Sequence, residues 1–261
     1  RIFLRGQFEH FGQQTLITVS GSRRQKHTAV VKDLTAALLF LKKMLAIQRI
    51  KPDVVIHRIV HGGRKLSKPT KLNKQINNYL NQLIPLAPLH QPVNLQGVAW
   101  ARRAWPRAEQ WGVFDTAIYR GMPAANKTYA TAKKITAKLP IEKYGFHGTS
   151  HAWAFRQAAQ MMKSPISKFS AVTAHLGAGS SLTLWQRGRP IDTSMGFTPL
   201  AGLVMATRAG DIDPAIPLFV QQQLHLTSAQ VSDLLVHKSG LLALCGLPDM
   251  RDVLGAAGYP V

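Results

Sequence analysis

Short apolar runs typical of buried strands alternate along this chain with segments of helical periodicity, and no other feature constrains its fold as strongly. Leucines spaced three or four residues apart predict a helix from about Asp33 to Arg49. The apolar run from Asp53 to Val60 then predicts a buried strand, which opens onto Gly62 and Gly63. In a chain of 261 residues this pattern favours an α/β fold, with one large domain or two ordinary ones.

The same reasoning extends to the rest of the chain. Asn94 is expected to cap a helix that carries Val98 on its apolar face, and Thr149 or Ser150 is expected to cap a helix that begins near Ser150. Further elements are expected as a helix at Leu72 to Leu83, strands at Gly112 to Thr116 and Lys168 to Leu176, a hairpin with its tip at Gln186 to Arg189, and helix starts at Asp213-Pro214 and Thr227.

Basic residues outnumber acidic ones by 33 to 12, and the net charge of +21 points to anionic partners such as phosphates, carboxylates or nucleic acid. The segment Trp100 to Trp111 interleaves tryptophans with arginines, as a nucleic-acid stacking surface does. It also has the pattern of a helix whose tryptophans belong to a core or a domain contact. No complete motif of a nucleic-acid-binding module accompanies it, so nucleic acid is not the expected partner.

Other classes of protein are disfavoured by the sequence. The longest apolar stretch, Leu34 to Leu41, is far shorter than the roughly 20 residues of a membrane span, so no membrane association is expected. Cys245 is the one cysteine among these residues, which excludes an internal disulfide and any multi-cysteine metal site here. His57 and His61 have the spacing of a zinc pair but lack the accompanying glutamate, and no Gly-x-Ser-x-Gly elbow is present. Neither a metal site nor a hydrolytic triad is predicted.

Polar segments that contain glycine fall at predicted strand ends or helix starts. Glycines there let backbone N–H groups surround anionic oxygens, and a helix N-terminus adds partial positive charge. Each segment is also compatible with an ordinary turn. The segments are His57 to Gly63, Tyr144 to His151, His175 to Ser181 and Met205 to Pro214.

Seven blocks, taken in chain order, are similar to the acetate kinase family, whose close relatives include propionate kinases. The blocks run from about Pro52 to Val253 and read HRIVHGG, LAPLHQPVN, FDTAIYRGMP, KYGFHGTSH, HLGAGSS, DTSMGFTPLAGLVMATRAGDIDPAI and SGLLALCGLPDMRDV. The resemblance implies an α/β fold of the acetate and sugar kinase, Hsp70 and actin type, with ribonuclease H-like domains that we place at residues 1–115 and 116–261. It also implies a cytoplasmic enzyme, a homodimer when full length, that transfers the γ-phosphoryl group of ATP reversibly to acetate, with magnesium, giving acetyl phosphate and ADP.

The resemblance assigns roles to residues of the matched blocks. It implies that Arg58 binds the substrate, that His147 and Arg208 stabilise the transferring phosphoryl group, and that Asp115 is the essential aspartate, while His151 is expected to be structural. Acetate is already ionised at neutral pH, so we expect Asp115 to orient an arginine or a magnesium-bound water rather than to act as a base. The implied pocket for the methyl group is formed by Val60, Leu89, Phe146 and Pro199, and the implied nucleotide contacts are His175, Leu176, Gly177, Ala178, Gly179, Asp249, Met250 and Arg251.

The match has gaps that leave more than one function open. Ala178 stands where the family has an asparagine that can bind nucleotide. The family's magnesium-linked residues lie in segments that would precede Arg1 or follow Val261, so the fold is expected to be incomplete. One methylene group is worth about 1 to 3 kcal/mol in a pocket, so the side chains do not separate acetate from propionate. The expectation is therefore an acetate or propionate kinase with a partial sequence, or an inactive remnant that binds an anion or a partner.

Overall fold

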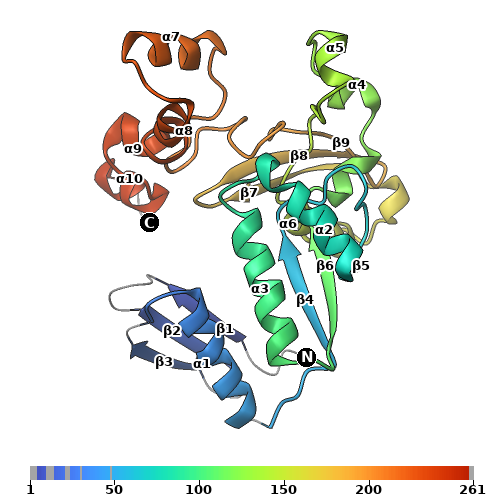
Figure 1. Ribbon diagram of the computed structural model, residues 1–261. Coiled ribbons are helices and arrows are strands. Elements are labelled where there is room, and N and C mark those ends of the chain that lie inside the picture. Colours follow the sequence, from blue (N-terminus) through green and yellow to red (C-terminus); the bar gives the residue numbers. More distant parts are fainter. Residues whose placement is uncertain (1–4, 10–14, 21–23, 30, 48, 259–261) are drawn as a thin grey trace. The chain divides into compact units, whose positions relative to one another are not determined.

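The computed structural model describes residues 5–9, 15–20, 24–29, 31–47 and 49–258 (Figure 1). The chain divides into two compact units. Unit 1 comprises residues 1–55 and 96–110, and unit 2 comprises residues 56–95 and 111–261. The predicted domain boundary between residues 115 and 116 concerns the complete two-domain fold and stays a prediction.

Unit 1 contains an antiparallel sheet in the order β1-β2-β3, followed by helix α1 (Leu34–Ile47). The helix lies within the range predicted from the leucine spacing, and the Asp33 carboxylate accepts a hydrogen bond from Ala36 N at 2.9 Å, as a cap does. The sequence analysis did not predict the three strands, which are β1 (Arg5–Glu9), β2 (Thr15–Ser20) and β3 (Arg24–Ala29).

A second sheet, in the order β4-β6-β5, is formed by β4 (Val54–Ile59), β6 (Glu109–Phe114) and β5 (Thr70–Lys71). Strand β4 matches the predicted strand, whereas β6 begins three residues earlier than Gly112. The Glu109 amide donates to Asp53 O at 2.8 Å and the Asp115 amide donates to Ile59 O at 3.0 Å. These bonds have the same offset in sequence, which is the pattern of parallel strands, so the carboxyl ends of β4 and β6 meet at one edge.

Helix α2 (Lys74–Gln82), the 3-10 turn η1 (Ile84–Leu86) and helix α3 (Gln91–Ala104) follow β5. The prediction that Asn94 caps a helix is wrong, because α3 already begins at Gln91. The Asn94 side chain instead accepts a hydrogen bond from Val60 N at 3.0 Å. The tryptophan prediction is confirmed for Trp100, which is buried and meets Trp105 edge to face at 5.4 Å.

The third sheet is antiparallel, in the order β7-β8-β9, with strands β7 (Ala171–Leu176), β8 (Ser180–Gln186) and β9 (Arg189–Thr193). The predicted strand and hairpin are both confirmed. Helix α6 (Gly148–Met161) packs on this sheet through a core cluster in which Phe155 stacks on Trp185 at a ring-centroid distance of 4.3 Å.

The remaining elements are short helices. Helix α7 begins one residue after the predicted Pro214, and the Asp213 carboxylate accepts from Ala215 N at 2.8 Å. The predicted Thr227 cap is confirmed, because Thr227 and Gln230 form a capping box. No helix in the described ranges is long and apolar enough to cross a membrane. These helices are η2 (Ala117–Gly121), α4 (Ala124–Lys127), α5 (Lys133–Thr136), η3 (Ile166–Lys168), α7 (Ala215–Gln223), α8 (Ser228–His237), α9 (Gly240–Cys245) and α10 (Met250–Ala256).

The first residue of α6, Gly148, contacts the backbone just after β6. Because of this contact, we expect one added methyl group at position 148 to lower the stability of the fold strongly. The Gly148 amide donates to Asp115 O at 3.0 Å, and a Cβ atom at position 148 would lie 2.1 Å from that oxygen. We expect Gly148→Ala to lower the free energy of unfolding by about 2 kcal/mol or more, because backbone must move to admit the methyl group. Urea unfolding measures the change.

Gly97→Ala is the matched control. Gly97 lies inside α3, and a Cβ atom there would meet nothing within 4 Å. This variant should raise the free energy of unfolding by about 0.5 to 1 kcal/mol, because alanine favours a helix over glycine. Equal effects of the two substitutions would contradict the steric explanation.

Candidate functional site

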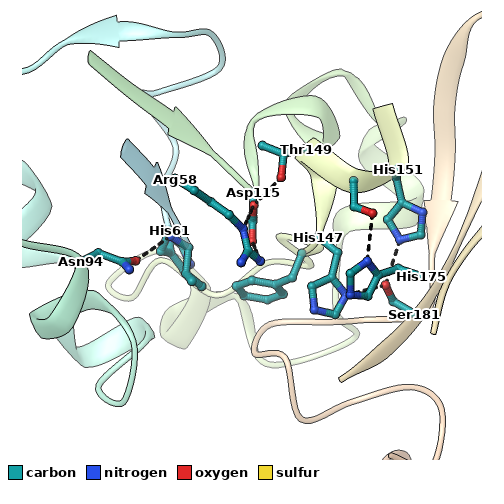
Figure 2. Close-up of polar contacts among 12 residues, drawn as sticks. Arg58, His61, Asn94, Asp115, His147, Thr149, His151, His175 and Ser181 are labelled. Carbon is teal, nitrogen blue, oxygen red and sulfur yellow. Dashed lines mark hydrogen bonds and ion pairs between the residues drawn. The ribbon is translucent and has the colours of Figure 1, made fainter. Parts of the chain in front are cut away.

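Arg58 and Asp115 form an ion pair at the edge where β4 and β6 end. The Arg58 guanidinium donates from Nε to Asp115 Oδ1 at 3.0 Å and from Nη2 to Oδ2 at 2.6 Å, and Thr149 Oγ1 donates to Oδ1 at 3.0 Å (Figure 2). Asp115 is buried, whereas the Arg58 side chain is 57% exposed. The hydrogen bond to Asp115 raises the pKa of Arg58. Asp115 therefore holds the guanidinium in one orientation and leaves its outer edge accessible.

His147 lies at the turn that leads into α6. Its backbone is left-handed, with φ of 56°, and its ring stacks on His175 at a centroid distance of 4.0 Å. Its Nδ1 atom is hydrogen-bonded to Ser181 Oγ at 2.9 Å. Burial, followed by the charges of His175 and Arg58, lowers the pKa of His147 to about 3, so the ring is neutral at physiological pH.

The prediction that Thr149 or Ser150 caps α6 is wrong. His147 occupies the N-cap position and makes no side-chain capping bond. The Thr149 hydroxyl is directed to Asp115, and Ser150 Oγ is hydrogen-bonded to His175 Nδ1 at 2.9 Å. Both hydroxyls orient residues of the site, which local capping rules did not reveal.

Arg208 joins this group from the other side of the glycine turn after β7. A Cβ atom built on Gly179 would lie 3.3 Å from His147 Cε1 and 3.4 Å from Arg208 Nη1, so both side chains lie beside Gly179. Arg208 Nη1 also donates to Pro199 O at 3.1 Å, and burial lowers the pKa of Arg208. Cationic groups thus converge with neutral imidazoles in unit 2, as binding of an anionic group requires.

His90 lies near the arginines of the site, and the sequence analysis did not single it out, although it lies within the matched block LAPLHQPVN. Burial lowers its pKa, and the charges of Arg208 and Arg58 lower it further. His90 is therefore close enough to both arginines to feel their charge. Its sequence surroundings are those of an ordinary proline-rich loop, which gave no signal for this position.

The residues predicted for the methyl pocket occupy different environments. Phe146 is almost fully buried, and its carbonyl accepts from the Tyr119 hydroxyl at 2.8 Å. Leu89 is 52% exposed. Val60 follows the strand that carries Arg58, and the Pro199 carbonyl receives Arg208 as described above. Their convergence on one small pocket stays a prediction.

A cavity of about 1000 Å³ in unit 2 brings together the two segments predicted to contact nucleotide. The end of β7 and its glycine turn form one part of the lining, and the start of α10 forms another. His175 and Gly179, which do not line the cavity, lie next to His147 instead. The predicted residues in the lining are Leu176, Gly177, Ala178, Asp249, Met250 and Arg251.

Magnesium is the metal that the resemblance implies, and we tested whether side chains of the site fit it. Among the described residues no three His, Cys, Asp or Glu side chains gather as a metal site. Both Asp115 oxygens are engaged by Arg58, and one also by Thr149. These residues do not fit a protein-ligated magnesium ion, and the mechanism proposed below uses the side chains alone.

Comparisons with known proteins show the family to which the chain belongs. The model of the Acetokinase family matches residues 4–258. An acetate kinase of Sulfurovum sp. (strain NBC37-1) is 40% identical over 245 residues, which cover 92% of this chain and 62% of the relative. An acetate kinase of Pseudarthrobacter chlorophenolicus is 44% identical over 208 residues, which cover 80% of this chain and 54% of the relative. The chain therefore spans about half to three fifths of the length of these curated relatives.

Solved structures give the same result. A propionate kinase from Francisella tularensis superposes with a TM-score of 0.90 at 34% identity, covering 98% of this chain and 67% of that protein. The acetate kinase of Porphyromonas gingivalis superposes with a TM-score of 0.85 at 32% identity, covering 99% of this chain and 67% of that protein. The predicted α/β fold of the acetate and sugar kinase, Hsp70 and actin type is thereby confirmed, and the chain belongs to the acetokinase family.

Proposed function

We propose that this chain carries the carboxylate-binding and phosphoryl-binding groups of an acetate kinase, which transfers the γ-phosphoryl group of ATP reversibly to acetate. The observation that carries the proposal is the grouping of Arg58, held by Asp115, with His147 and Arg208, which both lie beside Gly179. ADP or ATP is proposed to bind in the cavity whose lining includes Ala178 and Asp249. We further propose that the protein acts as a cytoplasmic homodimer.

In the proposed reaction a carboxylate oxygen of acetate attacks the γ-phosphorus in line, the bond to the β-phosphate bridging oxygen breaks, and ADP leaves. No proton moves, because the attacking carboxylate is already ionised. The chain's task is to align two anions and to offset charge on the transferring group.

Arg58 is suited to hold the acceptor carboxylate. Its Nε and one Nη2 hydrogen are used by Asp115, which leaves Nη1 and the second Nη2 hydrogen as a paired donor edge. Asp115 then acts by orientation, in agreement with the expectation that it is not a base.

His147 and Arg208 are suited to the transferring phosphoryl group. A neutral imidazole can donate a hydrogen bond to a phosphoryl oxygen without losing its proton, and the arginine supplies the full positive charge. His147→Gln is expected to lower kcat about 10² to 10³-fold, with KM changed less than about threefold. His237→Gln, an exposed histidine on α8, is the control and should leave both constants as they are. A His147→Gln enzyme with native kcat would contradict the assigned role.

The test of the proposal is incubation of the chain with acetate, MgATP and hydroxylamine, which traps acetyl phosphate as a hydroxamate. Hydroxamate formation above an Arg58→Ala control is the expected result. Propionate is assayed in parallel, since the Francisella tularensis relative is a propionate kinase. Absence of product with either acid, together with ADP binding by calorimetry, would favour the remnant that only binds an anion. Absence of both would overturn the proposal for this chain.

A further inference from the structure

Polar side chains form a row in the interior between α6 and the β7-β8 pair. Thr173 of β7 and Ser181 of β8 point inward, and His151 of α6 lies between them. His151 and Ser181 are fully buried, and Thr173 is 6% exposed. Buried polar groups need partners, so the identity of each donor and acceptor in this row is constrained.

The hydrogen bonds of the row join it to His147 without a gap. Trp185 Nε1 donates to Thr173 Oγ1 at 2.9 Å, and Thr173 Oγ1 lies 2.8 Å from His151 Nδ1. His151 Nε2 lies 2.8 Å from Ser181 Oγ, and Ser181 Oγ lies 2.9 Å from His147 Nδ1. Figure 2 shows the last two contacts, with His147 and His151 on either side of Ser181.

The direction of the row follows from its first member, since an indole N–H can only donate. Thr173 therefore accepts from Trp185, and among the described residues His151 Nδ1 is the acceptor within reach of the threonine proton. With Nδ1 accepting, a neutral His151 carries its proton on Nε2 and donates to Ser181. Ser181 in turn donates to His147 Nδ1.

The opposite direction of these hydrogen bonds is disfavoured, because it would leave one buried hydroxyl proton without an acceptor. If His151 donated from Nδ1, Thr173 would accept two hydrogen bonds, and its own buried hydroxyl proton would have no acceptor among the described residues. A buried donor without an acceptor costs free energy, so the first arrangement should be populated about tenfold or more over the second.

We propose that Trp185, Thr173, His151 and Ser181 form a directed hydrogen-bond chain that fixes His147 in the tautomer with its proton on Nε2. These four are positioning residues. The Nε2 atom lies beside Gly179, where a built Cβ atom would be 3.4 Å from it, and next to Arg208. The ring thus presents an N–H donor, and not a lone pair, to an anionic oxygen at that place. The identity of that oxygen as phosphoryl rests on the proposed function, whereas the tautomer does not.

The hydrogen-bond chain formed by Trp185, Thr173, His151 and Ser181 is called the relay below. The charge states of His151 and His147 agree with a relay in which both imidazoles are neutral. Burial, with the charge of His175, lowers the pKa of His151 to about 4. The groups that face His147 are His175, His151, Arg58 and Arg208, and each of them, after burial, lowers its pKa. Neither imidazole needs a second proton for the hydrogen bonds of the relay to form.

The direct test is long-range ¹H–¹⁵N correlation NMR on the chain labelled with ¹⁵N-histidine at pH 7.5. Of the ten histidines, His147 is assigned by loss of its signals in His147→Gln. We expect a protonated Nε2 and a hydrogen-bonded, unprotonated Nδ1 in at least about nine tenths of molecules. A His147 proton on Nδ1 overturns the proposal, and this result needs no variant of the relay to fold.

Matched variants of Thr173 test whether the relay sets the tautomer. Thr173→Val removes the hydroxyl while conserving shape, and we expect the His147 signals to move toward a mixture of tautomers. Thr173→Ser restores the hydroxyl and should restore the native spectrum. A native spectrum in Thr173→Val, with folding checked by circular dichroism, overturns the relay and leaves Ser181 alone as the partner.

Kinetics separate the relay from the proposed function. Ser181→Ala removes the donor to His147 Nδ1, and we expect kcat for acetyl phosphate formation to fall about tenfold or more while KM stays within about twofold. Native kcat in Ser181→Ala would overturn the functional part of the proposal. If the native chain shows the Nε2 tautomer but makes no acetyl phosphate, the relay stands and the proposed function of this chain fails.

Discussion

Replacing Arg58 with lysine is expected to lower kcat/KM for acetyl phosphate formation about 10³-fold. Lysine keeps the charge but offers one ammonium group, which cannot pair with both Asp115 oxygens and also present a two-donor edge to a carboxylate. Such a loss corresponds to about 4 kcal/mol of transition-state binding, within the range for a group that both binds and orients. Initial rates from the hydroxamate assay, over a range of acetate concentrations, measure it.

The matched control is Arg64→Lys. Arg64 lies in the same unit and pairs with Glu142 at 3.6 Å, but its side chain is 47% exposed and it makes no two-pronged contact with that carboxylate in the described structure. A surface pair of this kind is worth at most about 1 kcal/mol, so kcat/KM should stay within about threefold of native. Similar losses of kcat/KM in the two variants would show that activity depends on the positive charge of Arg58 and not on its two-pronged hydrogen bonding.

Asp115→Asn completes this test. If Asp115 only orients Arg58, the variant should lose activity about 10 to 10²-fold and keep the native shape of its pH–rate profile. Loss of one limb of the profile would instead assign Asp115 as a proton acceptor. Near-native activity would contradict the orienting role.

Mild acid is expected to destabilise the folded chain strongly, because it holds three histidines in neutral form, of which His61 and His151 are buried and His147 is half-buried. Burial lowers the pKa of His61 to about 4, that of His151 to about 4 and that of His147 to about 3. The unfolded chain takes up protons near pH 6.5, so below that pH it binds more protons than the folded chain. Stability therefore falls as the pH is lowered from about 6.5 toward 4, by at most about 1.4 kcal/mol per pH unit for each histidine.

Urea unfolding between pH 7.5 and pH 5 measures this slope, and His61→Asn tests its origin. His61 Nδ1 accepts from Gly63 N at 2.9 Å, a bond that asparagine Oδ1 can replace, while His61 Nε2 has no partner among the described residues. The slope should fall by the contribution of one histidine, at most about 1.4 kcal/mol per pH unit, in this variant. His225→Asn changes an exposed histidine whose φ of 51° also suits asparagine, and it should leave the slope as it is. An unchanged slope in His61→Asn would contradict the explanation.

Local patterns predicted those elements whose formation depends on nearby residues. The leucine spacing of α1, the apolar run of β4, the β8-β9 hairpin and the Thr227 capping box all lie where the sequence indicated. Each depends on periodicity, turn chemistry or a cap within a few residues, so it is readable without knowledge of the fold. The strands of unit 1 pair in an antiparallel sheet. They were missed because their sequences, RGQFE, TLITVS and RQKHTA, show no sustained alternation of apolar and polar residues.

The candidate site was predictable as a set of residues but not as an arrangement. The matched blocks identified Arg58, Asp115, His147 and Arg208, yet nothing in their spacing showed that Asp115 clamps the arginine. Asn94 and Thr149 were assigned as caps because both are good capping residues, but each hydrogen-bonds a residue at least 34 positions away. A polar side chain can hydrogen-bond either a nearby backbone N–H or a group that the tertiary fold places beside it. The local sequence does not show which of the two partners it takes.

The sequence by itself thus determined the α/β class, most elements beyond Asp33 and the family resemblance, because these rest on short-range periodicity and on residue identity. The parallel pairing of β4 with β6 decided that Arg58 meets Asp115. The packing of α6 on β7 and β8 decided which nitrogen of His147 faces Ser181. Both depend on contacts between distant segments, whose geometry is set only when the sheets and helices close on one another.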